Sequence, residues 1–579
     1  GKIVIPVLKT NVFVPINYIK SQFVQSPLIS LDIKHKNLLK IKNTRDNAKE
    51  KGYLISKSSD WVSGIGTYGD KKLKYQIRLK GLLSDHWDYG DDLWSYKLKI
   101  KGDKTLFGMK SFALQHPRVR NYMDEWYFLK MSSYSGLIAP RFIFSPLSIN
   151  GKRYPTYSIE ELFGKRLIEN NKKREGPIFM ISDKKIFNET FIQYPTISFY
   201  QENYYLKKPE GKKLLRRTQR LLNSYYADEL KASEVFDINL FAKAFALADL
   251  FGHDHSVLSQ NMRFYMNPVT GLIEPIPFDN EYILRLKDSG MMGEHYKHNV
   301  FNKEQIVENP VFYSIGNGLD SLYAVNRRLI NKLFLDPQFS KEYIKSLESI
   351  SKKDWLDDFF ISTEKEAQRN LSILHKSYPW YEFRKKGILY KNQNYIKSKL
   401  YPESSLLAFE EGSINNNGIF NVKIANKHSL PIEVLGISDR SGKVIKKPIK
   451  NNFLSNRPNL CIEYDNCLSK KLASLEYETF SFDINSLNFD LIKESGLTVV
   501  SRIIGTSKTT IDNVFFNQDI VRDKSIDLIN TDYLDIDEQN KTIQFKSGEW
   551  QINKNLIIPK GYIFKINSGT IVDLVENSS

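Results

Sequence analysis

The chain has 579 residues, which is too long for a single hydrophobic core and predicts about two to four domains. Hydrophobic residues make up 41% of it and aromatic residues 13%, which excludes an intrinsically disordered chain. The net charge of +18 favours anionic partners such as nucleotides, acidic polymers or anionic surfaces.

The distribution of charged and apolar residues limits the classes of partner and the location of the chain further. The basic residues are spread along the chain and form no tract typical of a nucleic-acid-binding arm, so we expect no DNA or RNA partner. No apolar run approaches the roughly 18 residues that a membrane-spanning helix needs. The first residues do not form a signal peptide, and we expect a native targeting segment to lie outside this sequence.

Two cysteines, Cys461 and Cys467, are separated by five residues. They form either a small disulfide in an oxidising compartment or two buried thiols. Their number excludes a disulfide-dense scaffold and a four-cysteine zinc site.

The first third of the chain predicts strands and helices in a mixed order. Apolar and polar residues alternate in the segments 29–34, 74–80 and 95–101, as in half-buried strands. Further strands are expected at 141–148 and 154–159, and helices at 37–51, 117–133, 162–174 and 207–226. In the third alternating strand, Lys97, Lys99 and Lys101 share one face, where they either contact a nucleotide's phosphates or face water.

The segment 251–281 carries the strongest functional pattern. Asp237 is expected to cap a helix over 238–251, which leads into the triplet His253-Asp254-His255. Two short strands, 262–266 and 272–278, are joined by the turn Asn267-Pro-Val-Thr-Gly271 and predict a hairpin. Such a hairpin would bring Asn261, at its entry, close to Asp279, at its exit.

The order Asp254, Asn261, Asp279 matches the order of the base and the two metal ligands in protein kinases. Carboxylate and amide oxygens are suitable ligands for Mg²⁺. Substrate phosphates and waters complete its coordination shell. The same residues could instead bond to nearby backbone groups in turns. The two histidines of the triplet could also hold Zn²⁺, although no third ligand is evident.

The predicted secondary structure changes twice in the remainder of the chain. Helical patterning dominates from about 317 to 400, and short alternating strands with polar turns follow from 406 to about 525, which predicts an all-β, sandwich-like domain. Residues 526–579 contain short strands a few residues apart. They predict either the start of a parallel β-helix or a small β cap.

Several long stretches of the chain resemble the CotH-type (spore coat protein H) atypical kinase family, in its bacterial branch. The matching stretches are ISLDIKHKNLLKI (29–41), IRLKG (77–81), SYKLKIKGDKTLFGMKSFALQHPRVRNYMDEW (95–126), INGKRYPTYSIEELFGKRLIENNKKREGPI (149–178) and NMRFYMNPVTGLIEPIPFD (261–279). The resemblance implies an α+β, protein-kinase-like domain over residues 1–405, with a core at about 27–285 and a helical lobe to about 400. It also implies an enzyme that uses ATP and Mg²⁺ (or Mn²⁺) to phosphorylate a protein acceptor or surface polymer, secreted or located at a cell surface or coat.

The resemblance also implies roles for individual residues, and two of these roles have rival candidates. Arg78 and Gly81 would lie near the nucleotide, and Lys99, or else Lys97, would contact its phosphates. Glu125 or Glu161 would orient that lysine. Asp254 would be the catalytic base, with His255 as a rival, and Asn261 and Asp279 would hold the metal.

Four positions depart from the family pattern. Leu93 and Trp94 stand where relatives often carry a lysine, Leu82 where they often carry an aspartate, and Pro155 where they often carry a glycine. Loss of a phosphate-binding lysine would favour a catalytically inactive pseudokinase, acting as a binding module for a coat component, surface polymer or polysaccharide. A third hypothesis, a polysaccharide-processing protein, rests only on the β-helix pattern, because no carboxylate pair typical of a glycoside hydrolase is evident.

Overall fold

The structure is a computed structural model. It describes residues 13–88, 93–182, 196–253, 255–257, 261–280, 282–284, 329, 332–334, 336–412, 418–428, 430–454, 475–485, 496–516, 532–553 and, with short gaps, 556–575. Cys461 and Cys467 lie outside these residues, so their state stays open. Among the described residues, no helix combines the length and apolarity needed to cross a bilayer.

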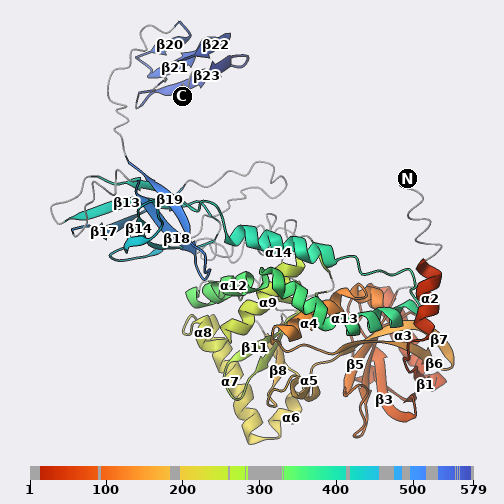
Figure 1. The fold of residues 1–579 in the computed structure, drawn as a ribbon. Coiled ribbons are helices and arrows are strands. Elements are labelled where there is room, and N and C mark those ends of the chain that lie inside the picture. Colours follow the sequence, from red (N-terminus) through yellow and green to blue (C-terminus); the bar gives the residue numbers. More distant parts are fainter. Residues whose placement is uncertain are drawn as a thin grey trace.

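The N-terminal part is a closed barrel of seven strands (Figure 1). Its strands are β1 (Ile29–Ile33), β2 (Val62–Tyr68), β3 (Lys71–Leu79), β4 (Tyr96–Ile100), β5 (Ser111–Gln115), β6 (Phe142–Ile149) and β7 (Lys152–Glu161). They follow the order β1-β2-β3-β4-β5-β7-β6, and the barrel closes because β1 pairs in parallel with β6. The helices α2 (Val14–Gln22) and α3 (His35–Lys51) belong to this part of the chain.

Apolar and polar side chains alternate along the barrel strands, so that the barrel has an apolar interior and a polar outer face. Ile77, Leu98 and Phe112 belong to the barrel core and are buried. Their neighbours in sequence point the other way, because successive side chains of a strand lie on opposite faces. The outer face of β3, β4, β5 and β7 therefore carries polar side chains, and this face forms one wall of the candidate site.

A helical part packs around α9 (Ile238–Phe251), in which ten of the 14 residues are buried. The Asp237 side chain accepts a hydrogen bond from the Leu240 N–H at 3.1 Å, which confirms the predicted cap. The other helices are α4 (Asp124–Tyr134), α5 (Lys165–Asn170), α6 (Glu202–Leu206), α7 (Pro209–Tyr226), α8 (Ala232–Val235), α12 (Pro337–Ile350), α13 (Lys353–His375) and α14 (Lys386–Leu400). A sheet of order β11-β10-β8-β9 lies among them, built from β8 (Ile178–Ser182), β9 (Thr196–Phe199), β10 (Arg263–Met266) and β11 (Ile273–Ile276).

The predicted helix over 117–133 begins later than the sequence indicated. Residues Pro117–Arg120 form a short 3-10 turn, and Asn121 and Tyr122 follow with φ of 45° and 57°. This left-handed backbone cannot continue an α-helix, so α4 starts only at Asp124. The break places Arg120 in a turn at the N-terminal end of α4.

Two barrel strands were not predicted. In β2, Gly64 and Gly66 weaken the strand pattern, but a Cβ atom on Gly64 would lie 2.4 Å from the Tyr75 ring, so the glycine makes room for that ring. In β5, Phe112 to Gln115 are all buried, and the alternation that reveals a half-buried strand is absent. The strands β8 and β9 were not predicted either.

Every described element from 406 to 516 is a strand, as predicted. These strands are β12 (Leu406–Glu410), β13 (Ile419–Asn426), β14 (Ile432–Ser438), β15 (Val444–Lys446), β16 (Phe453–Leu454), β17 (Tyr477–Asp483), β18 (Thr498–Ile503) and β19 (Thr510–Phe515). They form one sheet with its own apolar core.

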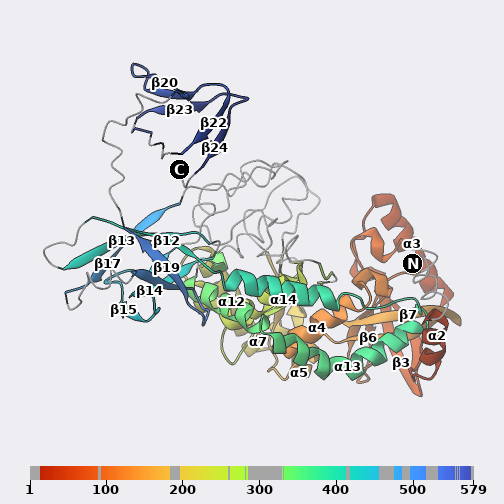
Figure 2. The same cartoon turned by 45° about the horizontal axis from the view of Figure 1, so that its top comes forward.

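The C-terminal segment is a small unit of five strands with a separate core (Figures 1 and 2). The strands are β20 (Leu534–Asp537), β21 (Thr542–Phe545), β22 (Glu549–Ile552), β23 (Ile563–Ile566) and β24 (Ile571–Leu574). β21 pairs in parallel with β23, and β22 pairs in parallel with β24.

Candidate functional site

The centre of the site is a buried ion pair between Lys80, which follows β3, and Glu160 of β7. The Lys80 Nζ lies 3.2 Å from Glu160 Oε2 and donates to Gln115 Oε1 at 2.6 Å. Gln115 in turn donates its Nε2 to Glu160 Oε2 at 2.6 Å, so the three side chains form a closed triangle. Charges removed from water need partners of this kind, because an unpaired buried charge is costly.

The charges of this triangle set the protonation state of its members. Burial lowers the pKa of Lys80 to about 8, although Glu160 acts in the opposite direction. Burial alone would raise the pKa of Glu160, but Lys80 and Arg120 outweigh it and lower that pKa. Near neutral pH the pair is therefore ionised.

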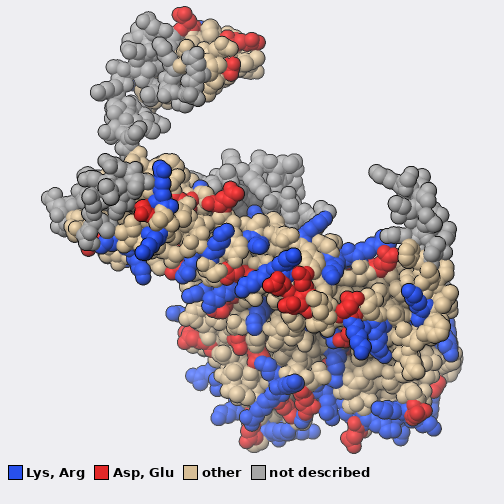
Figure 3. All heavy atoms as spheres, in the orientation of Figure 1, with Lys and Arg blue, Asp and Glu red and all other residues tan. Residues whose placement is uncertain are grey.

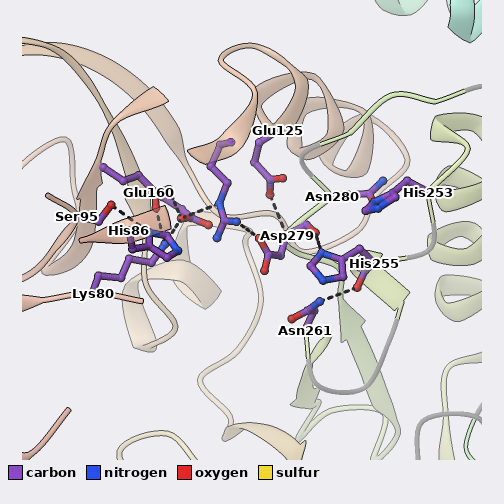
Figure 4. Close-up of polar contacts among 12 residues, drawn as sticks. Lys80, His86, Ser95, Glu125, Glu160, His253, His255, Asn261, Asp279 and Asn280 are labelled. Atoms are coloured by element: carbon purple, nitrogen blue, oxygen red, sulfur yellow. Dashed lines mark hydrogen bonds and ion pairs between the residues drawn. The ribbon is translucent and has the colours of Figure 1, made fainter. Parts of the chain in front are cut away.

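Arg120 connects the triangle to the hairpin residue Asp279. Its Nε lies 3.7 Å from Glu160 Oε2, and its Nη1 forms an ion pair with Asp279 Oδ1. Arg120 is buried, and its guanidinium also lies 5.4 Å from the centre of the Phe278 ring. Figure 4 shows the resulting line of charged groups from the barrel to the hairpin.

Asp279 is held in an unusual backbone conformation. Its φ is 71°, a left-handed value that is uncommon for a residue with a side chain. The Asp279 N–H donates to Glu125 Oε1 of α4 at 3.1 Å, and its carbonyl lies 2.9 Å from His255 Nδ1. Backbone strain of this kind is often found at functional sites, where surrounding contacts maintain it.

Asn261 lies on the same side of the hairpin, as the sequence predicted. The pairing of Arg263 with Ile276 sets the register of β10 and β11, so the residues just outside both strands meet. Asn261 donates its Nδ2 to the His255 carbonyl at 3.1 Å, and His255 therefore bridges Asn261 and Asp279 (Figure 4). Asp254, the expected base, lies outside the described residues.

The two histidines of the triplet have different partners. His253 Nδ1 lies 3.1 Å from Asn280 Oδ1, whereas His255 Nδ1 faces the Asp279 carbonyl. The contact with a carbonyl requires the proton on Nδ1, so a neutral His255 carries its ring lone pair on Nε2. Within the described residues no three His, Cys, Asp or Glu side chains are arranged to hold a metal, so the zinc alternative gains no third ligand there.

The oxygen donors at the hairpin suit a hard cation. Asp279 offers a carboxylate and Asn261 an amide oxygen, which is the donor type that Mg²⁺ and Mn²⁺ prefer in proteins. Phosphate oxygens of a bound nucleotide would complete such a shell. The residues present therefore fit a nucleotide-bound Mg²⁺ ion.

The lysines expected to contact phosphates occupy different surroundings. Lys99 is exposed, and its Nζ lies 4.5 Å from the centre of the Trp61 ring, which Arg78 also contacts at 4.7 Å. Lys97 is closer to the buried charges. Burial, together with repulsion from Lys80, Arg78 and Arg263, lowers the pKa of Lys97 to about 8.

Gly81 and Glu161, two further residues singled out by the family resemblance, each have neighbours of their own. A Cβ atom on Gly81, whose φ is 98°, would lie 2.2 Å from the His86 ring, so glycine lets that ring cover the loop after β3. His86 also contacts the Ser95 hydroxyl at 3.1 Å. Glu161 faces away and binds Arg141, with Nε to Oε2 at 2.8 Å.

The structure brings together residues that sequence analysis did not single out. Lys80, Gln115, Arg120 and Glu160 join Glu125 and Asp279 in one network. Lys80 and Glu160 both lie in stretches that resemble the family, but the sequence pointed to their neighbours Gly81 and Glu161 as site residues. The pairing could not be derived from spacing, because β4 and β5 lie between β3 and β7 in the barrel.

A scan against protein-family models identifies the CotH kinase protein family over residues 92–398, which is more than half of the chain. The chain belongs to this family. A comparison with curated proteins finds no match. The matched region of this CotH protein contains Gln115, Arg120, Glu125, Glu160 and the hairpin, whereas Lys80 precedes it.

The charges of this CotH protein are spread over its surface. In the face shown in Figure 3, Lys and Arg side chains lie over both the barrel and the helices, with acidic side chains among them. The sequence indicated the same spread. A local cluster of positive groups, Lys80, Lys97 and Arg120, lies at the candidate site.

Proposed function

We propose that this CotH protein is an ATP- and Mg²⁺-dependent phosphotransferase. The observation that carries the proposal is the continuous network from Lys80 and Glu160, through Arg120, to Asp279. In protein kinases a Lys–Glu ion pair positions the nucleotide phosphates and an aspartate binds the metal. Here the glutamate comes from a strand rather than from a helix.

Each residue would contribute one physical effect. Bound Mg²⁺ would neutralise charge on the transferring phosphate. Lys80 and Lys97 would neutralise the remaining phosphate charge, with Glu160 keeping Lys80 in place. Asp279 and Asn261 would hold the ion, and Glu125 would fix the Asp279 backbone. Asp254, or His255 through Nε2, would accept the proton of the acceptor hydroxyl.

We infer that the acceptor is a protein or a surface polymer at a cell surface or coat. The family supports this inference, and so does the absence of a clustered basic tract suited to nucleic acid. The C-terminal unit would help to attach the enzyme there. We propose that it is the start of a parallel β-helix, because equivalent residues of stacked strands recur at short intervals: Thr542 pairs with Ile563, and Glu549 with Ile571.

One observation favours a second candidate function, a pseudokinase that acts as a binding module. Arg120 occupies the carboxylate of Asp279, so a cation must displace it or share the ligand. If Arg120 stays in place, the protein would bind nucleotide weakly and would transfer no phosphate. The departures at Leu82 and Leu93 point in the same direction.

The test measures ATP binding through the rise in melting temperature that it causes, with and without Mn²⁺ or Mg²⁺. A ligand at 100 times its Kd stabilises the native state by about 2.7 kcal/mol. We therefore expect ATP to raise the melting temperature in a metal-dependent way. Asp279→Ala should abolish the metal-dependent part, and Glu160→Gln should weaken nucleotide binding. Glu169→Gln, which removes an exposed ion pair with Lys165, is the matched control and should change neither.

Transfer of the ATP γ-phosphate to a protein substrate or to the chain itself separates the two candidates. Metal-dependent binding with transfer supports the kinase, and binding without transfer supports the pseudokinase. The absence of any shift with nucleotide and metal in the wild type would contradict both.

A further inference from the structure

A cavity of about 500 Å³ lies beside α4. Its walls come from one face of α4, from the segment 136–143 and from the turn at 170–172. On α4 it is lined by Trp126, Leu129, Lys130 and Ser133, whose spacing of three and four residues places them on one face. The volume lies within the roughly 300–1,000 Å³ typical of small-molecule sites.

The lining of this cavity combines positive charge with an apolar wall. Lys130, Arg141 and Lys172 line it, with one carboxylate from Glu366; Arg141 is already paired with Glu161, which does not line the cavity. Lys130 and Glu366 form an ion pair at 2.7 Å, but both are exposed enough for solvent to weaken it. Lys172 is exposed and has no ion-pair partner among the described residues.

The apolar wall makes the cavity unsuitable for a bare inorganic ion. Trp126, Leu137 and Phe142 are buried and line one side of it. A ligand that fits both parts has one negative group, held between Lys130 and Lys172, and an apolar ring or chain against Trp126. This chemistry describes a small amphipathic organic anion.

Two walls of the cavity are connected through the chain to residues of the charged network. α4 carries Glu125, which holds the Asp279 N–H. Arg141 binds Glu161, the residue next to Glu160. An anion bridging Lys130 to Lys172 would tie α4 to the turn at 170–172 and so restrict the element that positions Asp279.

We propose that this cavity is an effector site for a small organic anion with an apolar part, and that its occupation strengthens metal–nucleotide binding at Asp279. Binding at the cavity stands on the lining residues alone. The coupling rests on the proposed function, because it needs a metal–nucleotide complex at Asp279. By thermodynamic linkage, the metal–nucleotide complex must strengthen anion binding by the same factor, for which we expect about fivefold.

The test uses the full chain and the fluorescent aryl sulfonate 8-anilinonaphthalene-1-sulfonate, which carries one fixed negative charge. Ser133 is exposed at the mouth of the cavity, so Ser133→Trp should fill it and remove the saturable binding. Ser362→Trp, at an exposed position of α13 outside the cavity, is the matched control and should retain it. Lys172→Glu should weaken binding about fivefold without disturbing the fold, because Lys172 is exposed.

The outcomes separate the cavity from the proposed function. Equal saturable binding in wild type and Ser133→Trp would place the probe elsewhere and overturn the site. A probe affinity that Mn²⁺ and ATP leave unchanged would overturn the effector role, even if the cavity binds the probe. If Mn²⁺ and ATP fail to bind the wild type, the proposed function falls, while the variant series still decides whether the cavity binds anions.

Discussion

At the scale of single residues, the site depends on how burial changes the charge of two lysines. Lys80 has Glu160 and Gln115 as direct partners, whereas Lys97 faces other cations, namely Lys80, Arg78 and Arg263. A positive group that lacks a close counter-charge in a partly buried position is ready to bind an anion. A phosphate would supply the counter-charge that Lys97 lacks.

The lowered pKa of Lys97 predicts a pH dependence of nucleotide binding. Its folded-state value of about 8 lies below the ordinary 10.5, so the lysine loses its charge as pH rises through about 8. We expect ATP affinity to fall about fivefold to tenfold between pH 7 and pH 9, since a charged hydrogen bond contributes about 1.5 kcal/mol or more. Titration of ATP at both pH values measures this change.

The lowered pKa of Lys97 has the opposite effect on folding stability, which increases with pH where ATP affinity decreases. The unfolded chain binds more protons than the folded chain between about pH 8 and 10.5, so the free energy of unfolding rises over this window. Lys97→Met should lower ATP affinity at pH 7 and reduce its pH dependence to the part that Lys80, whose pKa is also about 8, contributes. Lys101→Met, on the same strand face and exposed, should leave both unchanged; an equal effect would contradict the role of Lys97.

At the scale of elements, the hairpin β10–β11 aligns the two candidate metal ligands. Its turn is stabilised by Asn267, whose Oδ1 accepts the Val269 N–H at 2.9 Å and whose Nδ2 donates to Glu274 Oε1 at 2.6 Å. Glu274 is buried and also pairs with Lys173 at 2.9 Å. The turn that the sequence predicted therefore contains local backbone bonds and a buried carboxylate with two side-chain partners.

Asn267→Ala should loosen this hairpin and weaken metal binding at a distance. The substitution removes a donor from the buried Glu274 carboxylate, which costs about 1–3 kcal/mol of unfolding free energy. Urea unfolding and the Mn²⁺-dependent melting shift measure the two effects. Val269→Ala, in the same turn but 70% exposed, should change neither. A variant that loses stability but keeps the full metal shift would show that the turn does not set the alignment.

At the scale of the whole molecule, the β-sheet of 406–516 packs on the helical part. Leu430 and Ile503 belong to the same apolar core as α9 and α12. Ser507 donates its backbone N–H and its hydroxyl to Glu348 Oε1 at 2.9 and 2.6 Å, and the Tyr401 hydroxyl donates to the same oxygen. The C-terminal unit, by contrast, keeps a separate core.

Two truncations should therefore behave differently. A chain that ends at residue 531 should melt within about 1 °C of the full chain, because the described residues of the C-terminal unit form a separate core. A chain that ends at residue 405 should melt about 3 °C lower or more, since the helices lose Leu430 and Ile503. Differential scanning calorimetry measures both. Equal melting of the two truncated chains would contradict the packing of the sheet on the helices.

The sequence by itself determined the family, the mixed α+β class and the local elements of the site. Helix α9 and its Asp237 cap, and the hairpin with its turn, were predicted because their patterns are local: apolar spacing, a capping side chain and turn-forming residues. Short-range preferences of this kind do not depend on the rest of the chain. Asn261 and Asp279 each contact His255, which links the two ends of this hairpin.

Only the tertiary structure decided which charges meet. Lys80 and Glu160 are 80 residues apart and become partners because the barrel closes with β4 and β5 between their strands. Arg120 reaches both Glu160 and Asp279 because left-handed residues delay the start of α4. Charge pairing over such separations follows from strand order and helix placement, which no local pattern in the sequence encodes.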